Sequence, residues 1–92
     1  MDFEVSEEFF QKQAQMLDVL IEDVNIPKNV RAKLVKARDS LLKRLAADVR
    51  VSNSIYALEE ITYDLNLPMH ARSIVWGVLS DLESVKENLR KA

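Results

Sequence analysis

The sequence predicts an all-α protein, an antiparallel four-helix bundle built from two pseudo-repeated helical hairpins. Apolar residues recur every three or four positions along most of the chain, and no alternating strand pattern extends beyond a few residues. One segment occurs twice, because residues 25–31 (NIPKNVR) return 41 positions later as residues 66–72 (NLPMHAR). A period in this range is typical of stacked helical hairpins. We therefore expect one helical domain, residues 1–92, with pseudo-repeats at roughly 7–45 and 48–90.

The first hairpin contains helices predicted from about Glu7 to Asp23 and from about Pro27 to Leu45. Ser6 is a favourable N-cap, because its hydroxyl can accept a hydrogen bond from a free N–H of the first turn. A proline fits the first turn of a helix but restricts the preceding residue to extended geometry, which predicts a break just before the second helix. The apolar faces predicted here contain Phe9, Phe10, Met16, Leu17, Leu20, Ile21 and Val24, and then Val30, Leu34, Ala37, Leu41 and Leu45.

The second hairpin contains a helix that starts near Asp48 or Ser52, either of which could cap it, and a helix from Pro68 to about Leu89. All connections are short, which favours antiparallel neighbours. An open stack of the two hairpins, like that of HEAT repeats, is the alternative geometry. The apolar faces predicted here contain Val51, Ile55, Leu58, Ile61 and Leu65, and then Ala71, Ile74, Val75, Val78, Leu82, Val85 and Leu89.

The repeated segment marks two equivalent corners, each with an Asp at the end of one helix and an Arg in the first turn of the next. We expect each Asp carboxylate to form a charge-assisted bond with its Arg across the turn. Each Asn is expected to bond backbone groups or to adopt an unusual φ at the helix end. Two anion-binding corners are the functional alternative. The predicted structural turn residues are Asp23, Asn25, Pro27, Arg31, Asp64, Asn66, Pro68 and Arg72.

Two family resemblances follow from these residues. The corner, an Asp and then a Pro before Val30-Arg31 and Leu34, resembles the turn of HEAT-type helical repeats. More specifically, residues 26–31 (IPKNVR), Asp48-Val49-Arg50, and residues 66–72 leading into Trp76 resemble uncharacterised protein family 0147, small archaeal helical proteins of unknown function. This resemblance implies a compact four-helix protein. It supplies no activity and no functional residue, because the family has none assigned.

Composition excludes several classes of function. The absence of cysteine excludes disulfides, cysteine-rich zinc sites and thiol nucleophiles. The acidic N-terminus is unlike a signal peptide, and no apolar run approaches the length of a membrane span, so we expect a cytoplasmic protein without a membrane partner. His70 is the only histidine, and we interpret it as a turn or surface residue. With no Glu-x-x-His motif, Gly-rich loop or nucleophile–base pair visible, we expect no metal, no cofactor and no enzymatic activity.

Charge is distributed unevenly along the chain, with −6 in residues 1–27, +6 in residues 28–50 and −2 in residues 51–92. The first and second helices are oppositely charged, so the favoured interpretation is that they pair side by side. The alternative is a nucleic-acid-binding module, in which the basic second helix follows a phosphate backbone and binding weakens with salt. The residues that would contact phosphate are Lys28, Arg31, Lys33, Lys36, Lys43 and Arg44.

Large side chains lie beside the predicted apolar faces of the third and fourth helices. Trp76 follows the inward-facing Val75 and is displaced by about 100° around the helix. The structural interpretation is a wide apolar face that covers the hairpin interface. The functional interpretation is a protein–protein interaction or self-association surface, since Trp, Tyr and Arg are enriched at interfaces. The residues of this candidate partner surface are Trp76, Arg72, Leu79, Tyr56 and Tyr63.

Overall fold

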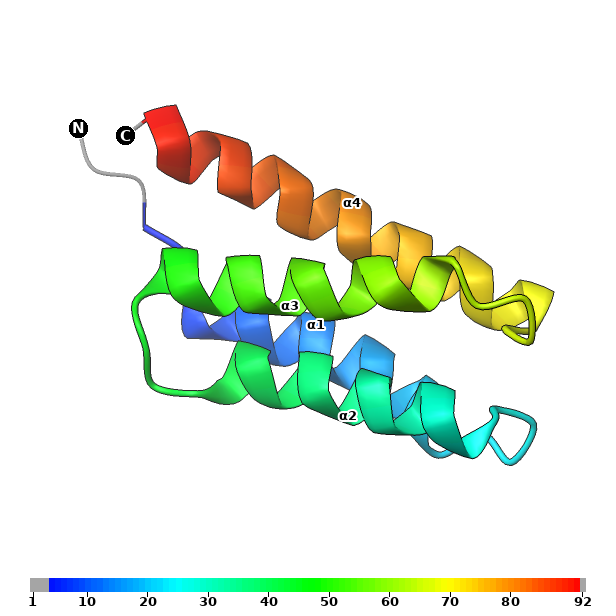
Figure 1. Cartoon of the computed structure of the whole chain (residues 1–92). Coiled ribbons are helices and arrows are strands. Elements are labelled where there is room, and N and C mark those ends of the chain that lie inside the picture. Colours follow the sequence, from blue (N-terminus) through cyan, green and yellow to red (C-terminus); the bar gives the residue numbers. More distant parts are fainter. Residues whose placement is uncertain (1–3, 92) are drawn as a thin grey trace.

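The computed structural model describes residues 4–91 as an antiparallel four-helix bundle (Figure 1). Its helices are α1 (Glu7–Ile21), α2 (Lys28–Leu42), α3 (Ala47–Thr62) and α4 (Met69–Lys91). Each helix packs against the next, and α1 also packs against α4, which closes the ring. No strand occurs in the described part of the chain. The predicted all-α bundle is confirmed, and its helices form a closed ring instead of an open stack.

The described helices begin in different ways, and of α1, α2 and α3 only α1 begins with a side-chain cap, at its N-cap residue Ser6. The Ser6 hydroxyl accepts a 3.1 Å hydrogen bond from the N–H of Phe9, which confirms the predicted N-cap of α1. Pro27 and Pro68 directly precede α2 and α4, where a missing N–H removes no intrahelical bond. The third helix begins earlier than either predicted start. Asp48 consequently lies in its first turn, where a carboxylate complements the helix dipole.

The second helix ends earlier than predicted, at Leu42 instead of Leu45. Lys43 has extended backbone angles, φ −69° and ψ 147°, so it cannot continue the helix. The carbonyl of Leu41, near the helix end, accepts two hydrogen bonds from the Arg50 guanidinium, of 2.6 and 3.1 Å. Leu45 therefore lies in the connection to α3 and is 49% exposed, so its predicted place in the core is wrong.

Both corners also begin earlier than predicted and leave apolar residues in solvent. The first helix ends at Ile21, before the predicted Asp23. Val24 and Leu65 then fall at the tips of the turns, where they are 89% and 95% exposed, and Met16 lies at the edge of the α1 face. The placement of these three residues in the core is therefore wrong.

The remaining predicted apolar faces meet in the centre of the bundle. Leu17 and Leu58, which occupy equivalent positions in the two hairpins, are both without solvent exposure. Phe9, Ile21, Ile74, Val85 and Leu89 are partly buried against this core. The fully buried large side chains are Phe10, Leu17, Leu20, Val30, Leu34, Leu41, Val51, Leu58, Ile61, Val75, Val78 and Leu82.

The hairpins turn at what we call the first corner, residues 23–31, and the second corner, residues 64–72. In each corner one carboxylate oxygen of the Asp accepts a hydrogen bond from the backbone N–H two residues later. The bond from Asn25 to Asp23 and the bond from Asn66 to Asp64 are both 2.9 Å long. No non-glycine residue of 4–91 has a positive φ. Each Asn therefore contributes its backbone N–H, and the predicted unusual φ does not occur.

The arginines of the corners bind backbone carbonyls. Arg31 donates 2.8 Å bonds to the carbonyls of Ile21 and Asp23, and a 3.1 Å bond to that of Ile26. Arg72 makes two such bonds, of 3.0 and 3.2 Å, at the end of α3. The predicted bond between each Asp carboxylate and its Arg is wrong, because the guanidinium instead satisfies carbonyls that have no intrahelical partner. It still joins the end of one helix to the start of the next.

The two corners are also bonded to each other. Nε2 of His70 lies 2.6 Å from Oδ2 of Asp23, and the side-chain amide of Asn29 donates a 3.4 Å bond to Oδ2 of Asp64. Asn29 and His70 are 41 positions apart and so occupy equivalent places in the two corners. The Asp carboxylate of each corner is therefore in contact with the residue at this place in the other corner. The pKa of Asp23 is lowered from its ordinary value, mainly by the N–H of Asn25 and then by His70.

The opposite end of the bundle is held by Arg50, which is only 5% exposed. Its guanidinium donates bonds of 2.6 and 2.9 Å to the two carboxylate oxygens of Glu7 and also binds the Leu41 carbonyl. It lies 3.7 Å from the ring centre of Phe10. The hydrogen bonds from Arg50 lower the pKa of the Glu7 carboxyl. One side chain thus joins α1, α2 and α3.

Candidate partner surface

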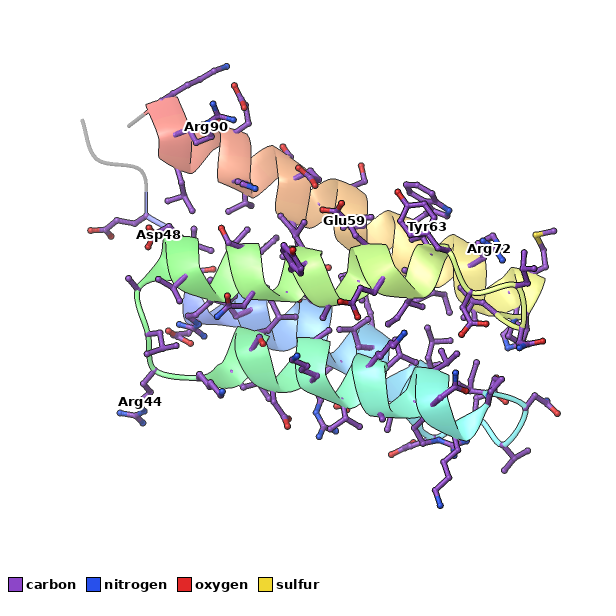
Figure 2. The ribbon with its side chains drawn as sticks, viewed as in Figure 1. Arg44, Asp48, Glu59, Tyr63, Arg72 and Arg90 are labelled. Carbon is purple, nitrogen blue, oxygen red and sulfur yellow. The ribbon has the colours of Figure 1, made fainter. Side chains whose placement is uncertain are left out.

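Helices α3 and α4 enclose a surface groove of about 430 Å³, which we call the aromatic groove. On α4, its residues are spaced by three and four positions, which places them on one face of the helix. Glu59 and Thr62 near the end of α3, and Tyr63 directly after it, line the facing edge. Figure 2 shows Glu59 and Tyr63 along the side of α3 next to α4. The residues lining the aromatic groove are Glu59, Thr62, Tyr63, Trp76, Leu79, Ser80 and Glu83.

The aromatic groove has an apolar floor and exposed aromatic walls. Leu79 is 5% exposed and forms part of the floor, while Trp76 is 54% and Tyr63 is 81% exposed. Large aromatic side chains with this much free surface are typical of the centre of protein–protein contacts. The structure therefore brings together three of the five residues that the sequence analysis placed on the candidate partner surface.

The other two predicted residues lie in different surroundings. Tyr56, which is 75% exposed, lines a smaller hollow of about 160 Å³ that shares Glu59 and Tyr63 with the aromatic groove. It therefore extends the same surface along α3. Arg72 is half-buried and donates its hydrogen bonds to the carbonyls at the end of α3. Its guanidinium stabilises the second corner and does not line the groove.

Acidic side chains lie on both walls of the aromatic groove. Glu59 comes from α3 and Glu83 from α4, and no cation is among the lining residues. In residues 4–91, no Lys, Arg or His side chain forms an ion pair within 4.0 Å of either carboxylate. The Glu59 side chain is exposed to solvent. The groove is thus apolar below and negatively charged at its rim.

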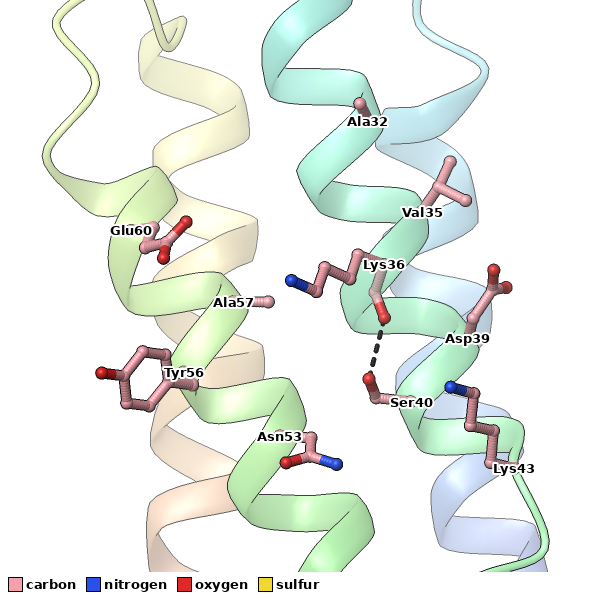
Figure 3. A pocket seen from close by; sticks show the side chains of 10 residues that line it. All are labelled: Ala32, Val35, Lys36, Asp39, Ser40, Lys43, Asn53, Tyr56, Ala57 and Glu60. Atoms are coloured by element: carbon pink, nitrogen blue, oxygen red, sulfur yellow. Dashed lines mark hydrogen bonds between the residues drawn. The ribbon is translucent and has the colours of Figure 1, made fainter.

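The basic residues of α2 do not form one continuous stripe. Lys36 and Lys43 line a groove of about 590 Å³ between α2 and α3, together with the acids Asp39 and Glu60 (Figure 3). The Ser40 hydroxyl, drawn there, donates a 2.9 Å bond to the Lys36 carbonyl. This groove therefore has mixed charge, with two cations and two carboxylates among its lining residues.

The remaining predicted phosphate contacts are divided among other places. Arg31 is bound to carbonyls of the first corner. Arg44 lines a separate hollow that also contains Glu7 and Arg50. Lys28 is exposed near the first corner, and Lys33 is half-buried.

Charge pairing between α1 and α2 is limited to one ion pair among the described residues, between Arg38 and Asp18 at 2.8 Å. Arg38 also contacts Asp39 on its own helix at 3.1 Å, and both bonds raise its pKa. The predicted attraction between the two helices therefore exists at one position. Lys36 and Lys43 instead line the groove between α2 and α3.

These features define a small all-α protein of two hairpins, with an aromatic, acidic groove on one side and dispersed basic residues on another. In residues 4–91, no group of three or more His, Cys, Asp or Glu residues is placed to hold a metal ion. No helix in that part of the chain has both the length and the apolar character needed to cross a bilayer.

The chain belongs to the Uncharacterised protein family UPF0147, whose model matches residues 1–85. It is 41% identical over 81 residues to the UPF0147 protein MJ1419 of Methanocaldococcus jannaschii, covering 87% of each chain. It is 40% identical over 81 residues to the UPF0147 protein TK2131 of Thermococcus kodakarensis, covering 86% of this chain and 98% of that one. The resemblance to uncharacterised protein family 0147 that the sequence shows is thus confirmed.

The bundle is also similar to a solved structure, the crystal structure of the unknown function protein MMP1188. The TM-score is 0.82 and the sequence identity is 29%, with 91% of this chain and 97% of that chain covered. This agreement supports the all-α bundle. The names of these related proteins carry no activity that could be transferred.

Proposed function

We propose that this protein is a non-enzymatic interaction module of the cytoplasm that binds a protein partner, or a second copy of itself, through the aromatic groove. One observation carries the proposal: Trp76 and Tyr63 stand exposed on the two walls of a groove whose floor includes the buried Leu79. Covering these aromatic surfaces would remove apolar area from water and would favour association. An enzymatic role has no comparable support, since the Thr62 hydroxyl in the groove donates its hydrogen bond to the backbone carbonyl of Glu59 and not to a carboxylate that could act as a base.

Substitution of Trp76 by Ala tests this function, because the side chain is 54% exposed and contributes more to the surface than to the core. Leu42→Ala is a matched control, since Leu42 is 47% exposed and lines a different hollow. We expect Trp76→Ala to weaken capture of a partner protein from nuclease-treated native lysate, or to lower the mass measured by light scattering. Thermal unfolding should change little in both variants. Identical masses and identical captured proteins for Trp76→Ala and the natural chain would refute the proposal.

Nucleic-acid binding by α2 is the second candidate. It is supported by Lys28, Lys33, Lys36, Lys43 and Arg44, which form no ion pair within 4.0 Å in the described part of the chain. The mixed groove around Lys36 and Lys43 favours it less than a continuous basic stripe would. A mobility-shift assay with RNA and DNA at low salt tests it, and binding should weaken steeply as salt is raised. Absence of a shift at low salt removes this candidate.

A further inference from the structure

We infer that the occupant of the aromatic groove is a lysine or arginine side chain carried by a basic segment of another protein. This inference rests on the proposed interaction function and adds the chemistry of the partner. It follows from three properties of the groove that act together: carboxylates without an ion-pair partner among residues 4–91, exposed aromatic side chains, and a buried leucine at the base.

The charges of the groove select a cation. Glu59 and Glu83 lie on opposite walls, and Glu60 lines the adjoining hollow with Tyr56. None of these three carboxylates has an ion-pair partner within 4.0 Å among residues 4–91. A cation that enters between the walls would therefore be attracted by carboxylates that no cation of the described chain already pairs with. The same carboxylates would repel an acidic peptide or a phosphate backbone.

The apolar parts of the groove match the rest of a long basic side chain. The stem of Lys or Arg is a hydrocarbon chain that can lie along apolar surface, here the floor that includes Leu79, while its charged end stays near the rim. Trp76 and Tyr63 line the same groove, and an aromatic ring attracts a cation that lies over its face. An uncharged apolar side chain would use the floor but would leave the carboxylates without a partner.

A second copy of this chain fits the groove less well than a separate basic segment. The α2 groove that could supply Lys36 and Lys43 also contains Asp39 and Glu60. Arg44 lies in a hollow shared with Glu7. Lys36 and Lys43 therefore bring carboxylates with them toward the acidic rim, whereas the carboxylate beside Arg44 is already bound by Arg50. A partner segment with consecutive basic residues and no acids avoids that repulsion.

The chain contains a built-in probe, because Trp76 is its only tryptophan. Titrating the full chain with an octalysine peptide should change Trp76 fluorescence in a saturable manner, and the affinity should fall as salt is raised. An octaglutamate peptide and an uncharged Gly-Ser peptide should leave the emission unchanged. Isothermal calorimetry of the same mixtures measures binding independently of the fluorescence.

Two double variants that remove the same charge distinguish peptide binding in the groove from general attraction of the peptide to an acidic protein. Glu59→Gln with Glu83→Gln should weaken octalysine binding by about tenfold or more. Glu8→Gln with Glu22→Gln removes the same charge from exposed positions of the first hairpin outside the groove and should change the affinity by less than about twofold. Circular dichroism confirms that both variants stay folded.

The possible failures are distinguishable. Equal weakening in both double variants, or equal binding of the uncharged peptide, overturns the cationic occupant and leaves the interaction function in place. If the fluorescence changes with protein concentration in the absence of peptide, and the measured mass rises with it, the occupant of the groove is a second copy of the chain and not a basic segment of another protein. If octalysine causes neither a fluorescence change nor heat, this inference is wrong, and the lysate experiment with Trp76→Ala decides the interaction function separately.

Discussion

The two corners of the bundle have the same local chemistry but different contacts with each other. In both, the Asp accepts a 2.9 Å bond from the N–H of the Asn that precedes the Pro by two positions. Across the corners, however, Asp23 meets the ring of His70 at 2.6 Å, while Asp64 meets the amide of Asn29 at 3.4 Å. The turn is therefore set by a short repeated motif. The side-chain bonds between the two corners, by contrast, involve the position at which one repeat has Asn29 and the other has His70.

The largest effect should come from the cores of the two hairpins. Leu17 and Leu58 occupy equivalent positions and are both fully buried. Leu17→Ala and Leu58→Ala should each lower the free energy of unfolding by about 2–5 kcal/mol, because each leaves a cavity in the packed core. Urea denaturation of both variants measures the free energy of unfolding and so compares the two cores. A cost well below that range at one site would show that the corresponding half is less tightly packed.

The corner arginines should give the next largest effect, and the first corner should be the more sensitive. Arg31 donates three hydrogen bonds to carbonyls, of 2.8, 2.8 and 3.1 Å, whereas Arg72 donates two, of 3.0 and 3.2 Å. We expect Arg31→Ala to cost about 2–3 kcal/mol and Arg72→Ala about 1–2 kcal/mol, because carbonyls at the helix ends lose their donors. Chemical denaturation again provides the measurement.

Lysine variants at the same two positions serve as controls. Lys keeps the charge but lacks the planar fork of donors, so it should recover only part of the lost stability. Full recovery by Lys at both corners would mean that charge, and not the geometry of the guanidinium, stabilises the turns. Equal costs of the two Ala variants would remove the predicted difference between the corners.

The contact between the corners should appear in the dependence of stability on pH. Because the pKa of Asp23 is lowered in the folded chain, its contribution is present above the ordinary Asp value and is lost as pH falls through the folded value. The main cause is the N–H of Asn25 and the second is His70. As the pH falls below about 4, the loss should be largest in the natural chain, smaller in His70→Asn and smallest in Asp23→Asn.

Thermal unfolding followed by circular dichroism across this pH range measures the three slopes. His70→Asn is an informative change, since it gives the second corner the residue that the first corner has at the equivalent position. If all three proteins lose stability in parallel, other carboxylates control acid unfolding and the Asp23 contact is not significant. A steeper slope for His70→Asn than for the natural chain would contradict the predicted order.

The helices and most of the core were predictable from sequence because they depend on local periodicity. Ser6, the two prolines and the spacing of leucines indicate where the helices begin and which faces they bury. The errors cluster at helix ends. Leu45 and Leu65 continue the apolar spacing, yet they lie beyond the last turn, where Arg50 or a repeated corner has already ended the helix. The periodicity of apolar residues alone does not show where contacts with distant residues end a helix.

The candidate site was partly predictable for the same reason. Trp76, Leu79 and Tyr63 could be placed near one surface from their positions on adjacent helices. The roles of Arg31, Arg72 and Arg50 could not, because each depends on carbonyls of a helix end that only the folded chain brings near. The one available signal for Arg50 was its place between two valines. Such a residue has to find buried acceptors or remain destabilising.

The smallest effect should come from the apolar tips of the two corners. Val24 and Leu65 occupy equivalent positions and are 89% and 95% exposed, so neither contributes appreciably to the core. Val24→Ser and Leu65→Ser should therefore change the free energy of unfolding by no more than about 0.5 kcal/mol, as measured by urea denaturation. A larger loss at one tip alone would show that this corner is covered in solution. The two corners would then differ at their exposed surfaces as well as in the bonds between them. The tip at which the substitution lowers stability more would mark a second contact surface at that end of the bundle.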